Sequence, residues 1–251
     1  MAVEPWLWPA GLGLLGLIFG SFIATLAIRW PQGRTIARGR SECGGCGVVL
    51  RPHELVPVLS YLLQRGQCRG CGARIAPSHL AVELLGLCVG AAAGWAAPGA
   101  AGVGGAVFGW ILLTLAALDL AAFWLPNLLT GALAVTGLIA AGAGLEPSLS
   151  DRLIGGAAGF GMLWLVAEGY RRARGRVGLG GGDPKLFGGI GLWLGWRALP
   201  GVLFAACLIG LAAVLILRLR GRALGAGAAL PLGVLLAAAA FPAWLLGSLI
   251  V

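Results

Sequence analysis

Two isolated aspartates stand beside apolar segments, where an ionised carboxylate is costly in free energy. Asp119 follows the apolar run Val107–Leu118, and Asp183 follows the glycine-rich stretch 177–182. A charged aspartate at the middle of a membrane span costs about 2.5 to 3.5 kcal/mol, so one found there indicates a function or a partner. Each aspartate is the best candidate partner for the other. The pattern predicts a carboxylate dyad at the membrane surface.

Such a dyad can perform acid–base chemistry without a metal or a nucleophile. Two carboxylates a few ångströms apart cannot both ionise comfortably, so one keeps its proton and the other acts as a base. The base can deprotonate a water while the acid polarises a peptide carbonyl. From the residues alone, an ion-coupled transporter is the alternative, because carriers also bind ions with isolated membrane carboxylates. A non-catalytic membrane scaffold is a third interpretation.

Helix signals place the two aspartates in one layer. Asp119 lies a few turns before the helix breaker Pro126, about 10 Å along a helix, which puts it just below the cytoplasmic surface. Pro184 suits the first position of a helix, so we expect Asp183 to be the N-cap of the span that follows. Both helices would then present a carboxylate at the same depth.

Composition indicates that these helices span a membrane. Of the 251 residues, 59% are hydrophobic and 11% are charged, and the mean hydropathy is +0.93. These values exclude an ordinary soluble domain. At about 20 residues per span, the chain has room for about eight transmembrane helices in an all-α fold. The expected spans cover roughly residues 6–28, 80–97, 101–122, 128–143, 151–171, 184–196, 202–217 and 228–249.

The basic residues predict the orientation of these spans. The net charge is +9, and most of the 18 Lys and Arg residues fall in the segments 29–74, 171–176 and 218–222. Alternate loops carry this charge, as the positive-inside rule requires of cytoplasmic loops, so both termini are expected outside. The same distribution argues against nucleic-acid binding. No basic segment precedes the first apolar run, so we expect that span to be retained.

Four of the six cysteines form two C-x-x-C pairs separated by 21 residues: Cys43, Cys46, Cys68 and Cys71. This spacing lets four thiolates surround one ion, and it predicts a structural zinc site. A disulfide is disfavoured in the reducing cytoplasm, whereas a redox dithiol or metal-free cysteines remain open.

The spans and the cysteine pairs together divide the chain into three parts. We expect a first transmembrane helix over residues 1–28, a cytoplasmic zinc-binding loop domain over residues 29–78 and a membrane core over residues 79–251.

Two further acids lie at membrane depth. Glu83 lies inside the second span, with His79 one turn before it. This pair is either a buried hydrogen bond or part of a functional site. Glu168 lies one turn before Arg171 and Arg172, and an ion pair at the membrane interface explains it.

Ordered motifs along nearly the whole chain resemble those of the bacterial type IV prepilin peptidases. They lie at Gly20-Ser21-Phe22 through Arg29-Trp30-Pro31, at residues 55–61 between the cysteine pairs, at Ala81-Val82-Glu83-Leu84-Leu85, at Asp119 with residues 125–130, at Gly180-Gly181-Gly182-Asp183-Pro184-Lys185-Leu186 and, more loosely, at residues 229–233. Two positions depart from that family's usual pattern. Ala24 replaces an Asn, and Pro184 replaces the Val or Ile that commonly follows the second aspartate.

The resemblance implies a GxGD-type aspartic protease of the bacterial inner membrane, with Asp119 and Asp183 as its catalytic pair. Gly180, Gly182 and Lys185 match the motif around the second aspartate, and Glu83 matches the motif of the second span, so these four are expected to support the site. The implied substrates are type IV prepilins or type II secretion pseudopilins, cut at the cytoplasmic face. The resemblance also implies N-methylation of the new terminus with S-adenosylmethionine.

Overall fold

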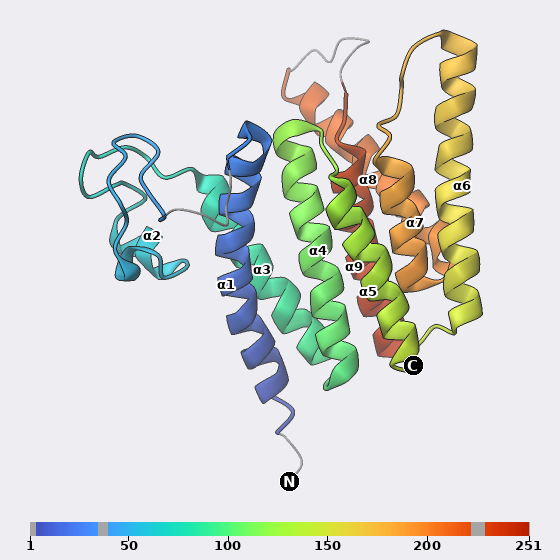
Figure 1. The fold of residues 1–251 in the computed structure, drawn as a ribbon, viewed down its shortest axis with the longest axis horizontal. Helices are drawn as coiled ribbons and strands as arrows, with labels where there is room; N and C mark the ends of the chain where they lie inside the picture. The colour runs from blue at the N-terminus through green and yellow to red at the C-terminus, as the bar shows by residue number, and fades with distance from the viewer. Residues whose placement is uncertain (1–3, 35–39, 222–228, 251) are drawn as a thin grey trace. The chain divides into compact units, whose positions relative to one another are not determined.

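A computed structural model describes residues 4–34, 40–221 and 229–250 of this chain. Within those ranges the regular structure is helical, apart from two isolated β-bridges (Figure 1). The chain divides into two compact units, unit 1 (residues 1–117) and unit 2 (residues 118–251). The prediction of an all-α membrane protein is confirmed.

Six helices of the described residues are long and apolar enough to cross a membrane. They are α1 (Leu7–Arg29), α3 (Pro77–Ala96), α4 (Ala100–Ala122), α6 (Leu149–Arg174), α8 (Leu199–Leu219) and α9 (Leu232–Ile250). Each corresponds to an expected span. Residue Ala228, where the last span was expected to begin, lies outside the described residues.

Two expected spans form helices that are too short to cross a bilayer unaided. They are α5 (Asn127–Gly142), with 16 residues, and α7 (Asp183–Leu194), with 12 residues. At about 1.5 Å per residue these helices are roughly 24 and 18 Å long, against a hydrocarbon core of about 30 Å.

The segment between α1 and α3 contains the short helix α2 (Leu59–Leu63) and the 3-10 turns η1 (Trp30–Gln32) and η2 (Pro52–Glu54). A further turn, η3 (Trp196–Ala198), follows α7.

In unit 1, α1 and α3 pack through glycines that bring their backbones into contact. A Cβ on Gly16 would lie 2.0 Å from the carbonyl oxygen of Gly86, so no other residue fits without moving a helix. The indole of Trp110, from α4, donates a hydrogen bond to the same carbonyl at 3.0 Å. Close backbone packing of this kind is typical of helices in membranes, where small residues line the contacts.

In unit 2, α7 contacts α5, α6 and α9 (Figure 1). Its contact with α6 is again between backbones, because a Cβ on Gly191 would lie 2.2 Å from the carbonyl oxygen of Gly155. The side chains of Phe187 and Ile190 are fully buried in this unit. Helix α7 is therefore surrounded by protein, which explains how a helix too short to span the bilayer is tolerated at membrane depth.

Arg152, near the start of α6, is a buried cation with an exposed fraction of 1%. Its guanidinium donates hydrogen bonds to five backbone carbonyls, those of Gly137, Leu145, Glu146, Pro147 and Leu192. These carbonyls come from α5, the α5–α6 loop and the C-terminal end of α7. Arg152 therefore ties together three segments of unit 2.

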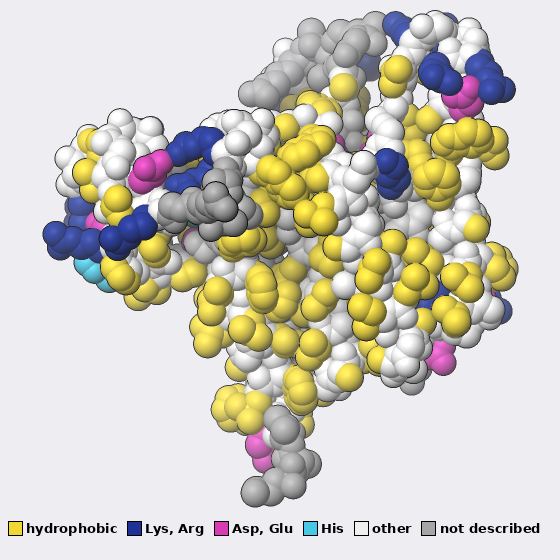
Figure 2. Space-filling view, viewed as in Figure 1, with side chains coloured by type: hydrophobic (Ala, Val, Ile, Leu, Met, Phe, Trp, Pro, Cys, Tyr) yellow, Lys and Arg dark blue, Asp and Glu magenta, His cyan; other side chains and the backbone are white. Residues whose placement is uncertain are grey.

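The surface of each unit fits a lipid environment. Hydrophobic side chains spread over the outer faces of the helices, and Lys and Arg gather over the loop that precedes α3 and around the end of α6 (Figure 2). At the end of α6, Arg171 and Arg172 form ion pairs with Glu168 at 2.7 and 2.8 Å. The expected pairing of Glu168 is confirmed.

Candidate active site and cysteine cluster

Asp119 lies in the last turn of α4 and is buried, with an exposed fraction of 4%. Its Oδ2 accepts a hydrogen bond from the backbone N–H of Val234, at the start of α9, at 3.2 Å. A Cβ on Gly233 would lie 2.8 Å from the same oxygen. The N-terminal end of α9 therefore holds the Asp119 carboxylate, and Gly233 leaves room for it.

Asp183 is the first residue of α7 and is also buried, with an exposed fraction of 7%. The prediction that Asp183 is the N-cap was wrong, because Gly182 occupies that position. The carbonyl of Gly182 accepts the N–H of Leu186 at 2.9 Å, which starts the helix one residue early. The carboxylate instead lies beside Gly180, where a Cβ would be 3.0 Å from Oδ2. Its side chain is thus available for interactions outside its own helix.

The structure brings Asp119 and Asp183 together within unit 2. A Cβ on Gly182 would lie 2.6 Å from the Cβ of Leu125, and a Cβ on Gly233 would lie 3.1 Å from its Cδ2. The side chain of Leu125 therefore packs against the backbone beside both aspartates. The two carboxylates are close enough to interact electrostatically. The predicted meeting of two acids from distant segments agrees with this geometry.

Lys185 lies two residues after Asp183 and joins the starts of two helices. Its Nζ donates a hydrogen bond to Oδ1 of Asn127, the first residue of α5, at 2.7 Å. Helix α7 begins with Asp183, and α5 begins two residues after Leu125. The contact therefore links the helix that carries Asp183 to the segment that contains Leu125. The supporting role expected of Lys185 stays a prediction.

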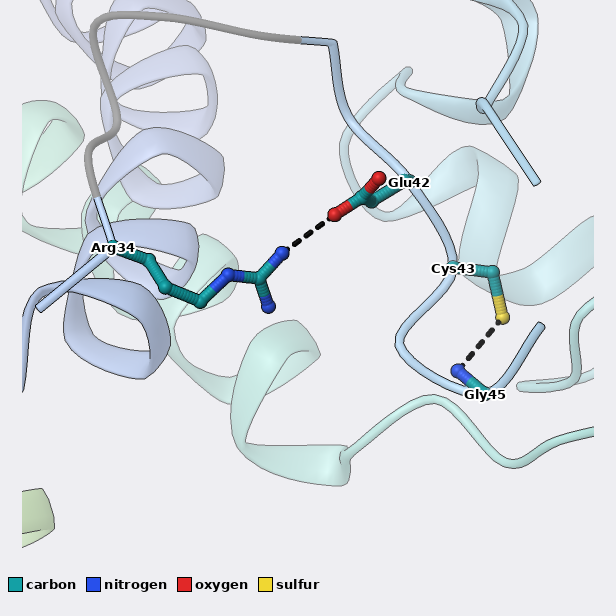
Figure 3. Close-up of polar contacts among 4 residues, drawn as sticks. All are labelled: Arg34, Glu42, Cys43 and Gly45. Carbon is teal, nitrogen blue, oxygen red and sulfur yellow. Dashed lines mark hydrogen bonds and ion pairs between the residues drawn. The ribbon is translucent and has the colours of Figure 1, made fainter. Parts of the chain in front are cut away.

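The four cysteines lie on two loops of similar construction in unit 1. In each loop, the N–H of the glycine after the second cysteine bonds to the carbonyl of the first cysteine at 2.9 Å, and this glycine has a φ of 71°. A backbone N–H also donates to the first sulfur of each pair, from Gly45 to Cys43 and from Gly70 to Cys68, both at 3.4 Å. Figure 3 shows the first of these bonds. The left-handed φ explains why Gly47 and Gly72 follow the cysteine pairs.

The sulfurs of Cys43, Cys46, Cys68 and Cys71 all lie within 4.8 Å of one another, and those of Cys43 and Cys71 are 3.8 Å apart. Tetrahedral zinc with Zn–S bonds of about 2.3 Å separates its sulfurs by about 3.8 Å. The four cysteines therefore fit a single metal ion, as the spacing predicted.

Backbone hydrogen bonds in this cluster lower the pKa of its thiols, whereas neighbouring thiols raise the pKa of Cys71. Hydrogen bonds from the backbone of Cys46 and Gly45 lower the pKa of Cys43 to about 6. The backbone of Ala73 also favours a thiolate at Cys71, but the neighbouring thiols, first that of Cys46, raise the pKa of Cys71 to about 12. Four thiolates this close need a cation between them, which supports metal binding.

Glu83 makes its contacts within unit 1. Its Oε2 accepts the backbone N–H of Val58 at 2.7 Å, and its Oε1 lies 3.7 Å from Nε2 of His79. The predicted His–Glu pair is therefore present, and it also fixes a segment of the loop that carries the cysteines.

Three residues of the site and its support were missed by sequence reasoning. Leu125 and Gly233 lie in motifs that the family resemblance covered, but nothing in their type indicated contact with the aspartates. Arg152 had a visible signal, since it lies outside the basic clusters and close to an apolar run. A lone arginine in such a place indicates a buried set of acceptors.

Comparison with known proteins identifies the family. Residues 14–97 match the bacterial Peptidase A24 N-terminal domain, and residues 106–216 match the type IV leader peptidase family. A prepilin leader peptidase/N-methyltransferase from Pectobacterium carotovorum subsp. carotovorum is 34% identical over 234 residues, covering 84% of this chain and 84% of that protein. The chain belongs to the type IV leader peptidase family. Membership and the six apolar helices make it an inner-membrane protein.

Other members carry the same name. The prepilin leader peptidase/N-methyltransferase of Burkholderia pseudomallei (strain K96243) is 35% identical, over 85% of this chain and 79% of that protein. The protein of that name from Neisseria gonorrhoeae is 32% identical, over 86% of this chain and 85% of that protein. No solved structure matches this chain with statistical significance.

Proposed function

We propose that this protein cuts the basic leader from type IV prepilins or type II secretion pseudopilins at the cytoplasmic face of the inner membrane, and then methylates the new N-terminus. The observation that carries the proposal is the pair of buried carboxylates, Asp119 and Asp183, that meet around Leu125. Relatives named prepilin leader peptidase/N-methyltransferase align over most of the chain and support both activities.

The two aspartates act as general base and general acid in peptide hydrolysis. The ionised carboxylate takes a proton from a water molecule, whose oxygen attacks the scissile carbonyl carbon. The protonated carboxyl donates a hydrogen bond, and then its proton, to the carbonyl oxygen. When the intermediate collapses, the C–N bond breaks and the leaving amine takes a proton from the dyad. Because two negative charges on neighbouring carboxylates are unfavourable, the dyad starts with one proton.

A prepilin presents its cut site at the depth of this dyad. Its basic leader stays in the cytoplasm while its apolar stem lies in the bilayer, so the scissile bond rests near the interface. In the proposed orientation the N-terminus of the chain is periplasmic, and the ends of α4 and α6 face the cytoplasm. Arg171, Arg172 and Arg174 then lie among lipid phosphates rather than against the basic leader.

Cys43, Cys46, Cys68 and Cys71 would hold a zinc ion with a structural role. Four thiolates fill a tetrahedral shell and leave no position for a substrate, so this zinc would brace the loop without taking part in a reaction. S-adenosylmethionine would supply the methyl group for the second activity.

The test is to incubate purified protein with a prepilin and follow the mass of the product. We expect the wild type to remove the leader, and Asp119→Asn or Asp183→Asn to slow this step by roughly 10³-fold or more, because each removes a proton-transfer group. Asp151→Asn is a matched control, because Asp151 is a partly exposed acid at the start of α6 whose bond from the Trp196 indole an amide oxygen can also accept. Continued cleavage by Asp183→Asn would overturn the assignment of the dyad.

A further inference from the structure

A cavity of about 530 Å³ lies within unit 1, and the cleavage chemistry assigned above does not use it. It is lined by α1, the loop that carries the four cysteines, α2 and the start of α3. Its wall carries polar groups from each of these elements, among them Thr25, Arg29, Tyr61, His79 and Glu83. Part of the wall appears in Figure 3, where Arg34 pairs with Glu42 next to the first cysteine loop. A space of this size with mixed walls is typical of a small-molecule site.

Glu83 supplies a carboxylate on the α3 side of this cavity. Its side chain is buried, with an exposed fraction of 6%, and it accepts the N–H of Val58. Val58 has a φ of 62°, which is a strained value for a β-branched residue. Strain of this kind persists where neighbouring groups fix the backbone, and it gathers at ligand sites. Glu83 thus holds the segment before α2, which supplies Tyr61, against the cavity.

Arg29 supplies the opposite charge on the α1 side. It is half-buried at the end of α1 and lines the cavity. Among the described residues it has no ion pair, whereas Arg34 is engaged by Glu42. Two further charged groups line the cavity: Arg74, which is exposed, and Glu54, which accepts the backbone N–H of Arg51. Arg29 is the more buried of the two guanidiniums without a described ion pair, and Glu83 is the most buried of the lining carboxylates. This combination suits a small molecule that carries a carboxylate, together with a second group that is cationic.

We propose that this cavity is the methyl-transfer site, in which Arg29 binds the carboxylate of S-adenosylmethionine and Glu83 binds the new α-amino group of the trimmed pilin. The proposal rests on the function proposed above and names the place of its second step. Arg29 ends a transmembrane helix, so the cavity lies at the membrane interface, where a trimmed pilin would present its terminus. A guanidinium binds a carboxylate with paired hydrogen bonds, and a buried carboxylate binds an ammonium strongly.

The transfer balances in atoms and charge. The α-ammonium of the pilin gives one proton to Glu83, and the freed lone pair of the nitrogen attacks the methyl carbon of the sulfonium. The C–S bond breaks with its electrons remaining on sulfur, which becomes a neutral thioether, and the new N–C bond leaves a methylated ammonium. Glu83 then releases its proton to solvent. Excess charge from the sulfonium is thus carried away as that proton.

The test uses the purified full-length protein and a peptide that begins at the trimmed N-terminus, so that methyl transfer is measured without cleavage. We expect Glu83→Gln to slow methyl transfer by roughly 10²-fold, because it removes the proton acceptor. The amide oxygen of Gln still accepts the Val58 N–H, so the loop should keep its position, which retained zinc content would verify. Glu4→Gln, at an exposed glutamate outside the cavity, is the matched control.

A second measurement concerns binding alone. We expect Arg29→Gln to weaken the binding of S-adenosylhomocysteine by roughly tenfold or more, the loss typical of a charge-assisted hydrogen bond. We expect Glu83→Gln to bind that compound like the wild type while the KM for the peptide rises. Arg69→Gln, at an exposed arginine between Cys68 and Cys71, is the control.

The outcomes separate this proposal from the cleavage mechanism. Methyl transfer to the trimmed peptide by Asp183→Asn, together with its loss in Glu83→Gln, would support two separate sites. Transfer at the wild-type rate by Glu83→Gln would overturn the cavity assignment and leave the proposed function intact. Failure of the wild type to methylate the peptide would instead overturn the methyltransferase half of the proposed function, and this proposal with it.

Discussion

The Asp119 carboxylate is held by a backbone that follows it by more than a hundred residues. The N–H of Val234 reaches Oδ2, and Gly233 leaves the space that the oxygen fills. The position of the acid thus depends on the start of α9 as well as on α4. At the scale of single residues, we expect the position of the Asp119 carboxylate to depend on the absence of a side chain at Gly233 as well as on charged residues.

Gly233→Ala tests this dependence. The added Cβ would lie 2.8 Å from Oδ2 of Asp119 and must displace the carboxylate rather than the helix. We expect leader removal to slow by roughly 10²-fold, since a misplacement of about 1 Å can have this effect, while the fold is retained. Gly247→Ala, in the same helix but facing open space, should cleave like the wild type. Equal rates for the two variants would count against the proposed position of Asp119.

Arg152→Met tests the second residue-scale feature. It removes five hydrogen bonds to carbonyls that are grouped around a buried guanidinium. A buried acceptor that loses its partner costs about 1 to 3 kcal/mol, so we expect the free energy of unfolding in detergent to fall by at least about 2 kcal/mol. Arg197→Met, at an exposed arginine over Trp196, should change it by about 1 kcal/mol or less. A fall no larger than that of the control would contradict this role.

Sequence reasoning identified the residues whose chemistry is unusual in a membrane. Asp119, Asp183 and the cysteine pairs stand out because charge and thiol spacing are rare there. Arg152 was missed because its partners are backbone carbonyls, which every residue has. The capping of α7 was misread because the prediction relied on residue type, whereas the first helical hydrogen bond begins at the carbonyl of Gly182.

At the scale of elements, glycine decides how closely the helices approach. Gly16 and Gly86 allow α1 and α3 to touch, as Gly155 and Gly191 do for α6 and α7. The 45 glycines of the sequence, many of them in runs, indicate close packing of this kind. The sequence did not predict which glycines make the contacts, because that depends on the register between two helices.

Two substitutions in α1 compare a glycine in a helix contact with a glycine that faces open space. The Cβ of Gly16→Ala would meet the backbone of Gly86, which cannot yield as a side chain does. We expect the variant to lose about 1 to 3 kcal/mol of stability, as overpacked helix contacts do. Gly11→Ala adds its methyl group where no atom lies within 4 Å, and we expect it to gain up to about 1 kcal/mol from helix propensity. Thermal unfolding in one detergent would rank the two, and the reverse order would refute the packing argument.

Helix length was predicted less well than helix position. All the expected spans are helical among the described residues, yet α5 and α7 are too short to cross the bilayer alone. Apolar composition cannot distinguish a helix that faces lipid from one enclosed by other helices. Helix α7 belongs to the second kind, and this enclosure allows its first residue to be a buried aspartate.

At the scale of the whole molecule, we expect the fold of the loop that carries the four cysteines to depend on a metal, because they form the one possible metal site found among the described residues. Purified protein should contain about one zinc ion per chain, and Cys46→Ser should lower this content. Cys88→Ser, at a free cysteine of α3, should not. Removal of zinc by a chelator should speed amide hydrogen exchange in the loop and in α2, with little change in α6 to α9. Uniform acceleration across all the helices would contradict a local structural role.

The contact between Val234 and Asp119 also bears on how the protein is made. Translation produces α4 before α9, so the donor that Val234 supplies to Asp119 is added only when α9 is made. A nascent or prematurely terminated chain without α9 would therefore lack this contact. We expect such a chain to remove leaders slowly, so that activity waits for the insertion of α9.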